Sequence, residues 1–142
     1  MLKSKSTDTY SGTVSSQATR LLLGITAEHD LDFRSFDVKT AFLYTRLNKF
    51  SEGIYMRRPK EISDTEMPDC LLGGLYGLDI ASKLFEEHFS NTLTTMGFTR
   101  LISDPQVFRL DKDGDFCLLS TFVYDALAAA SPGSPLLDFV EK

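Results

Sequence analysis

The 142-residue sequence has no tryptophan and few of the side chains that build soft-ligand metal centres. Its cysteines are Cys70 and Cys117 and its histidines are His29 and His88, and no pair has the spacing of a zinc site. No apolar run approaches the roughly 18–20 residues of a membrane span, and residues 1–11 lack a signal-peptide core. We therefore expect free thiols in a reducing intracellular compartment, cytoplasmic by default, and no membrane partner.

Positive charge is also scarce. The chain has 15 Lys and Arg against 20 Asp and Glu, a formal net charge of -5, and its basic residues are scattered. A domain that binds nucleic acid by itself usually presents a basic face, so the composition predicts little autonomous nucleic-acid binding. The 42% of hydrophobic residues is typical of one soluble globular domain that buries a core.

Apolar periodicity predicts two main helices. The first should start at a cap provided by Ser15 or Ser16 and end near residues 28–30. The second should run from about residue 79 to Gly97, where glycine favours a helix stop. The apolar positions of the first helix are Val14, Ala18, Leu21, Leu22 and Ile25. Those of the second are Ala81, Leu84, Phe85, Phe89, Leu93 and Met96.

Alternating residues predict strands at 31–36, 54–56, 106–110 and 116–123. Asp37 closes the first strand, and the turn at residues 111–114 (Asp-Lys-Asp-Gly) favours a tight hairpin between the last two. Residues 60–70 form a polar loop. This order of helices and strands predicts an α+β fold, with an antiparallel sheet backed by helices. Acidic residues at two separate strand ends are where such a sheet would hold a divalent metal.

Four short motifs follow one another along the chain. Residues 36–43 (Phe-Asp-Val-Lys-Thr-Ala-Phe-Leu) and residues 75–78 (Leu-Tyr-Gly-Leu) resemble two motifs of reverse transcriptases from copia-type retrotransposons. The first is their first carboxylate motif, and the second is their template- and nucleotide-contacting motif. Gly-Phe-Thr at 97–99 with Ser-Asp-Pro at 103–105 resembles the approach to the catalytic hairpin. Thr-Phe-Val-Tyr-Asp at 121–125 falls where the family has Thr-Tyr-Val-Asp-Asp.

The resemblance implies RNA-directed DNA polymerisation by two-metal phosphoryl transfer, in which three Asp carboxylates hold two Mg²⁺ ions. It implies partners as well, namely an RNA or DNA template-primer and a deoxynucleotide. Asp37 and Asp125 match catalytic carboxylates, and Phe42 matches the aromatic gate that selects deoxynucleotides. The positions carried over as metal-binding are Asp37, Val38 and Asp125, and those carried over as nucleotide-binding are Phe42, Tyr76 and Gly77.

The chain also departs from the family pattern. Tyr124 stands where the first Asp of the hairpin pair is expected, and a phenol is neutral at pH 7. If Tyr124 were instead the tyrosine of the motif, the two Asp positions would fall on Ala126 and Leu127. Asp79 follows the second motif where the family has Lys-Gln. We therefore expect a degenerate active site that no longer keeps Mg²⁺ as a functional pair.

The resemblance further implies an incomplete palm, because the family's basic fingers segment, which should precede Thr9, and its thumb and RNase H segments are not recognised in this sequence. The expected organisation is a polar tail at 1–12, a partial reverse transcriptase domain of fingers and palm at 13–130, and a linker with a truncated helix at 131–142. The first hypothesis is thus an inactive fragment of a retrotransposon polyprotein.

Other interpretations remain open. Asp37 could be a helix N-cap, Asp125 a solvated turn residue and Phe42 a plain core residue. The chain could also be a reverse transcriptase that is active when a partner supplies the missing parts. A third hypothesis is a domesticated interaction module, which binds a protein partner or itself through exposed apolar surface.

Overall fold

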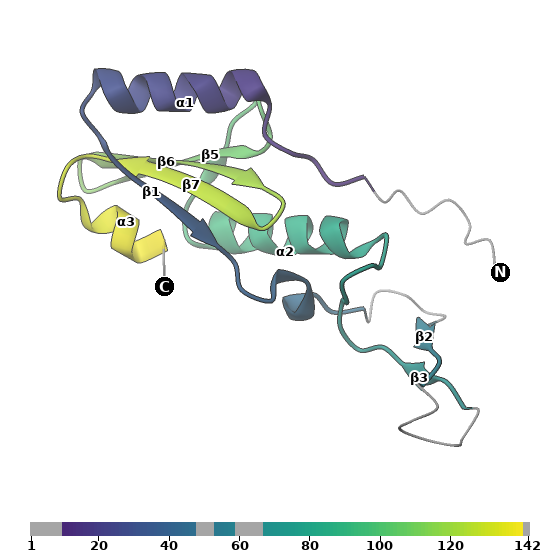
Figure 1. Ribbon diagram of the computed structural model, residues 1–142. Coiled ribbons are helices and arrows are strands. Elements are labelled where there is room, and N and C mark those ends of the chain that lie inside the picture. Colours follow the sequence, from purple (N-terminus) through teal and green to yellow (C-terminus); the bar gives the residue numbers. More distant parts are fainter. Residues whose placement is uncertain (1–9, 48–52, 59–66, 141–142) are drawn as a thin grey trace.

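The computed structural model describes residues 10–47, 53–58 and 67–140 (Figure 1). These parts of the chain form three α-helices, a five-stranded antiparallel sheet and a two-stranded ribbon. The helices are α1 (Ser16–Glu28), α2 (Ala81–Thr95) and α3 (Pro135–Val140), with a 3-10 helix η1 (Ala41–Tyr44). The strands are β1 (Asp32–Asp37), β2 (Tyr55–Met56), β3 (Asp69–Cys70), β4 (Thr99–Arg100), β5 (Val107–Lys112), β6 (Asp115–Phe122) and β7 (Asp125–Ala130).

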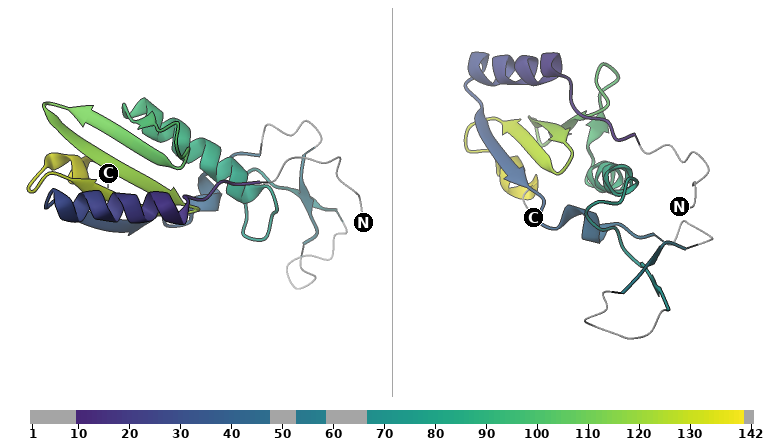
Figure 2. Two further views of the ribbon diagram at one scale, coloured as in Figure 1. Left: turned by 90° about the horizontal axis from the view of Figure 1, so that it is seen from above. Right: turned by 45° about the vertical axis from the view of Figure 1, so that its right-hand side comes forward.

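The main sheet has the order β1-β7-β6-β5-β4, and every neighbouring pair in it is antiparallel. Helix α1 covers one face, whereas α2 and α3 lie against the other (Figures 1 and 2). The β2–β3 ribbon extends away from this body (Figure 1). The predicted α+β class, with an antiparallel sheet and helices against it, is confirmed.

Both predicted main helices are confirmed, and their caps explain where they begin and end. The Ser15 side chain accepts a hydrogen bond from the Ala18 backbone N–H at 3.1 Å, which satisfies a donor at the start of α1. Gly97 ends the turn after α2 with a φ of 100°, a conformation that glycine adopts without strain. The apolar stripe of α1 is narrower than predicted, because Leu22 is buried and Leu21 is 64% exposed.

Strand β7 was not predicted, because its sequence Asp-Ala-Leu-Ala-Ala-Ala favours a helix locally. It is nevertheless the second strand of the sheet and pairs with both β1 and β6. Ala129 packs with Leu22 and Leu118 in the cluster under α1, and Ala128 and Ala130 belong to the core cluster on the opposite face. Small side chains let helices approach both faces closely, and this burial outweighs local propensity. The short strands β3 and β4 were missed as well.

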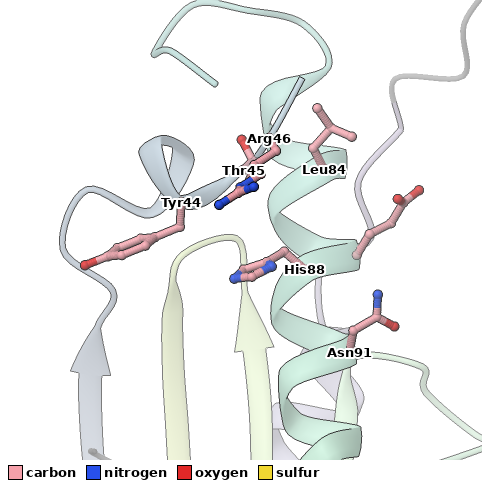
Figure 3. A pocket seen from close by; sticks show the side chains of 7 residues that line it. Tyr44, Thr45, Arg46, Leu84, His88 and Asn91 are labelled. Carbon is pink, nitrogen blue, oxygen red and sulfur yellow. The ribbon is translucent and has the colours of Figure 1, made fainter. Parts of the chain in front are cut away.

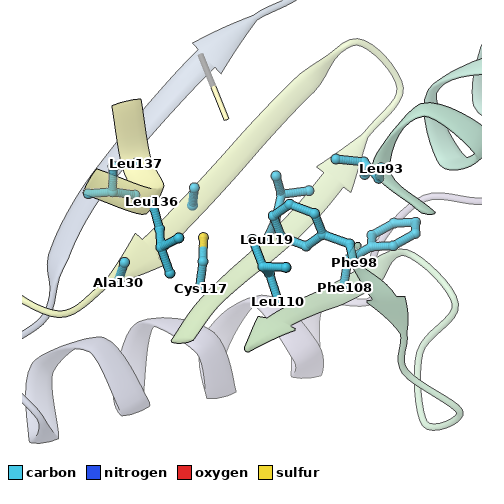
Figure 4. Packing of buried hydrophobic residues seen from close by; sticks show 10 residues of the cluster. Leu93, Phe98, Phe108, Leu110, Cys117, Leu119, Ala130, Leu136 and Leu137 are labelled. Carbon is cyan, nitrogen blue, oxygen red and sulfur yellow. The ribbon is translucent and has the colours of Figure 1, made fainter. Parts of the chain in front are cut away.

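The largest core cluster lies between the sheet and the helices α2 and α3 (Figure 4). Phe108 and Leu119 are central to it, and each such side chain contributes about 1.5–3 kcal/mol through burial. Helix α3 adds Leu136 and Leu137 to this core. The predicted linker at residues 131–135 leads directly into this helix, and its last residue is already the first of α3. The division of the chain into three regions stays a prediction, since residues 1–9, 48–52, 59–66 and 141–142 lie outside the described parts. None of the described helices has the length and apolar character needed to cross a membrane.

Candidate functional site

Two carboxylates predicted from distant parts of the sequence lie side by side in the sheet. Asp37 ends β1, Asp125 begins β7, and the two are directly opposed in the register of these strands. The Val38 backbone N–H donates to the Tyr124 carbonyl at 2.9 Å, so the Asp37–Asp125 pair is a non-hydrogen-bonded one. In such a pair the Cβ atoms are about 4.5–5.5 Å apart, and two like charges placed directly opposite each other repel.

The hairpin that carries Asp125 turns through Val123 and Tyr124, because Phe122 and Asp125 are already paired. Val123 has a φ of 56° and Thr40, on the segment after Asp37, has a φ of 54°. Both are β-branched, and such residues are strained in the left-handed region. Strain of this kind persists where the surrounding structure imposes it and is frequent at functional sites.

The carboxylates border a pocket of about 590 Å³ on the face of the sheet that α1 covers. Two rows of paired residues line it, Asp37–Asp125–Phe122 and Ser35–Leu127–Ser120. Thr19 of α1 and Val14, just before the helix, complete the wall. The Ser120 hydroxyl is buried and has no hydrogen-bond partner among the described residues. The pocket therefore combines two acids, hydroxyls and an apolar lining.

The aromatic residues predicted to contact a nucleotide come together beside the hairpin. The Phe42 ring meets Tyr76 edge-on at 4.9 Å between ring centroids and meets Tyr124 edge-on at 6.1 Å. Phe42 is only 7% exposed, and it also packs edge-on against Phe85 of α2. The interpretation of Phe42 as a core residue thus has direct structural support.

Three further predicted features have defined positions. Gly77 has a φ of 90° in the turn after Tyr76. Val38 packs at the edge of the cluster of Ala41, Phe42, Ala81 and Phe85. The N-cap of η1 is Thr40 and not Asp37, so Asp37 does not cap the following helix. In the described ranges, no three His, Cys, Asp or Glu side chains are grouped so that they could hold a metal ion.

A second, smaller pocket of about 240 Å³ lies between the end of η1 and α2 (Figure 3). Tyr44 and Arg46 face His88 and Asn91 across it, and Glu87 also lines it. None of the residues predicted to bind metal or nucleotide lines this pocket. It is separate from the pair formed by Asp37 and Asp125.

Sequence reasoning missed several residues around the carboxylates. Ser35 could have been found, because it lies two positions before Asp37 and side chains two apart in a strand share a face. Ser120 and Thr19 carry no such signal, since strand pairing and helix docking bring them to the site. Gln106 was also missed; it is buried and hydrogen-bonds Thr121 of the hairpin strand.

Comparison with known proteins shows similarity to reverse transcriptases over most of the chain. The family described as reverse transcriptase (RNA-dependent DNA polymerase) matches residues 3–142. The Pol polyprotein of transposon RE1 from Arabidopsis thaliana is 30% identical over 123 residues, which cover 84% of this chain and 8% of that protein. The Pol polyprotein of transposon TNT 1-94 from Nicotiana tabacum is 32% identical over 122 residues, 83% of this chain and 9% of its own length.

A shorter relative, the putative transposon Ty5-1 protein of Saccharomyces cerevisiae, is 36% identical over 110 residues, 75% of this chain and 34% of the yeast protein. No solved structure matches the chain at a significant level. The chain thus spans less than a tenth of the length of the plant polyproteins that it matches. Because the family match extends over nearly every residue, this chain belongs to the reverse transcriptases of copia-type retrotransposons.

Proposed function

We propose that this chain is a palm segment of a retrotransposon reverse transcriptase whose active site has lost its metal-binding chemistry, so that it does not polymerise DNA. The ancestral reaction is RNA-directed DNA synthesis on a template-primer with deoxynucleotides. One observation carries the proposal: Tyr124 occupies the hairpin position directly before Asp125, and its ring packs against Phe42.

The donor set argues against a functional pair of magnesium ions. Two-metal transfer in this family uses three carboxylates, and Mg²⁺ requires near-octahedral oxygen ligands at about 2.0–2.1 Å. Asp37 and Asp125 supply two carboxylates, whereas Tyr124 supplies a neutral phenol. A phenol does not offset the charge of two divalent ions, so the residues at this site do not fit the pair.

The aromatic packing argues in the same direction for the nucleotide. A gate residue excludes a ribose 2′-hydroxyl only if its ring reaches the sugar. The ring of Phe42 is instead enclosed by Tyr76, Phe85 and Tyr124. Tyr124 thus stands where the family has a metal-binding carboxylate, and its ring also helps to enclose Phe42.

Primer extension tests the proposal. The purified chain is incubated with an RNA template, a DNA primer and deoxynucleotides, in Mg²⁺ and separately in Mn²⁺, and no extension is expected. Extension that disappears in Asp37→Ala would refute the proposal. Tyr124→Asp restores the third carboxylate, and any gain of extension that also requires Asp37 would identify Tyr124 as the lesion.

Exposed apolar side chains favour a second candidate, a protein-interaction module. Leu21, Leu23 and Phe33 are large apolar residues of α1 and β1 that remain exposed in the described structure. Exposed apolar side chains can take part in contacts with a partner. A defined dimer in sedimentation experiments that dissociates in Phe33→Ser would support this candidate, and a monomer at all concentrations would count against self-association.

A further inference from the structure

A segment before α1 is fastened to the body of the protein by its backbone. Three of its N–H groups donate to acceptors on α2, on β6 and in the loop between β4 and β5. Gly12 donates to Glu86 Oε2 of α2 at 2.9 Å, and Val14 donates to the Thr121 carbonyl of β6 at 3.3 Å. Ser15 donates to Asp104 Oδ2 at 2.9 Å. Thr13, between them, forms an isolated antiparallel bridge with Phe122.

This segment, residues 12–15, lies beside β6 beyond the first residue of β5 and so extends the sheet there. Strand β5 begins at Val107, which pairs with Ser120 of β6, so the end of β6 extends beyond its neighbour. The bridge at Thr13 and the hydrogen bond to Thr121 occupy that end of β6. The segment therefore lies against the strand that leads into the hairpin carrying Tyr124 and Asp125.

Gln106 connects the two carboxylates that hold the segment. Its side-chain Nε2 donates to Glu86 Oε1 at 2.6 Å, and its backbone N–H donates to Asp104 Oδ1 at 2.9 Å. Its Oε1 accepts a hydrogen bond from the Thr121 hydroxyl at 2.7 Å. Glu86 and Asp104 thus each accept a hydrogen bond from segment 12–15 with one oxygen and from Gln106 with the other. Gln106 itself is only 3% exposed.

Glycine leaves room where the segment passes closest to this network. A Cβ atom on residue 12 would lie 2.6 Å from Gln106 Nε2, closer than side chains approach one another. That nitrogen donates to Glu86 Oε1, so a side chain at residue 12 that displaced it would disturb this hydrogen bond. The close approach of Gly12 is therefore part of the arrangement.

The position of Val14 connects the segment to the candidate site. Val14 lies between the fastened residues Gly12 and Ser15, and it lines the same pocket as Asp37 and Asp125. Thr19 of α1, which follows directly from this segment, lines the pocket too. The hydrogen bonds that fix residues 12–15 therefore fix one wall of the pocket.

We propose that Glu86, Asp104 and Gln106 form a latch that holds residues 12–15 against β6 and thereby sets the shape of the pocket beside Asp37 and Asp125. The three latch residues are positioning residues and do not contact the carboxylate pair. The latch is independent of the proposed loss of metal binding, since its contacts involve neither Tyr124 nor Asp37.

Site-resolved amide exchange tests the latch on the whole chain. In the unmodified protein the amides of Gly12, Val14 and Ser15 should be protected, and unprotected exchange at all three would overturn the proposal. Glu86→Gln leaves one acceptor oxygen for two donors, so exchange at Gly12 should rise by at least about tenfold. The amide of Leu119, in the centre of the core, should keep its rate.

A matched control separates the latch from a general effect of charge. Asp113→Asn makes the same change in charge at an exposed hairpin turn, where asparagine tolerates the positive φ of 55°, and it should leave all three amides unchanged. The methyl groups of Val14 and Leu127, two residues that line the pocket, give a second reading by NMR. Their chemical shifts should change in Glu86→Gln and not in Asp113→Asn, and the reverse pattern would refute the latch.

If Glu86→Gln does not fold, Gly12→Ala provides the equivalent perturbation from the segment side. Its Cβ should displace the segment from Gln106 and raise exchange at Val14 and Ser15 by about the same factor. Unchanged exchange in Gly12→Ala would show that the segment is not held where the latch requires it.

Discussion

Replacing Tyr124 by aspartate should make the stability of this protein depend on magnesium. The substitution removes an edge-to-face contact with Phe42, which contributes about 0.5–1.5 kcal/mol for aromatic pairs in general. It also places a third negative charge beside Asp37 and Asp125. Two unit charges about 6 Å apart repel by about 0.7 kcal/mol in bulk water. Without divalent ions, Tyr124→Asp should therefore lose about 2 kcal/mol of unfolding free energy.

Two companion variants separate these contributions. Tyr124→Asn loses the ring without adding a charge, so it should be destabilised by about 1 kcal/mol. Tyr124→Phe keeps the ring and should unfold like the unmodified protein. Each kcal/mol corresponds to a shift in melting temperature of about 2–4 °C for a chain of this size, which thermal unfolding followed by circular dichroism measures readily.

Magnesium should act on the aspartate variant alone. A ligand at ten times its dissociation constant stabilises the folded state by about 1.4 kcal/mol, so Mg²⁺ should recover most of the deficit of Tyr124→Asp. The unmodified protein and Tyr124→Asn should show no comparable rise in melting temperature. An equal rise in all three proteins would refute the reasoning, because the third carboxylate would then not decide metal binding.

Three other properties follow from the described structure. Burial raises the pKa of the Asp104 carboxyl, but hydrogen bonds from Ser15 and Gln106 outweigh it and leave the pKa below its usual value. Asp104 therefore stabilises the fold above about pH 4, and this contribution is lost as the pH falls through the lowered pKa. The difference in urea stability between the unmodified protein and Asp104→Asn should thus shrink from pH 6 to pH 3, and a constant difference would contradict it. Cys117 is buried and its pKa is raised to about 12, mainly by burial, whereas Cys70 is exposed. A thiol reagent at pH 8 should label one cysteine in the native protein and two after denaturation, and rapid labelling of both in the native state would be inconsistent with this core. Phe108→Ala should cost about 3–5 kcal/mol, measured by chemical unfolding, and a loss below 1 kcal/mol would show that Phe108 is not in a packed core.

Local sequence predicted the helices and the tight turn correctly where a single cap, glycine or turn signal marked them. The Ser15 cap, the apolar stripe ending at Gly97 and the Asp-Gly turn at residues 113–114 each predicted an element that the structure contains. Caps, glycine stops and tight turns depend on neighbours within a few residues, so the sequence alone carries them. The family motifs likewise identified Asp37 and Asp125 as positions of interest before any pairing was known.

Tertiary structure decided the features that depend on distant neighbours. The alanine-rich β7 is a strand only because β1, β6 and helices on both faces surround it, and nothing in its local sequence indicates this. The direct pairing of Asp37 with Asp125 follows from that strand. Gln106 gains its role solely from contacts with Glu86, Asp104 and Thr121. Sequence determined which residues could carry the chemistry, and the packing of β7 between its neighbours determined which of them meet, because contacts distant in the chain form only when the core closes.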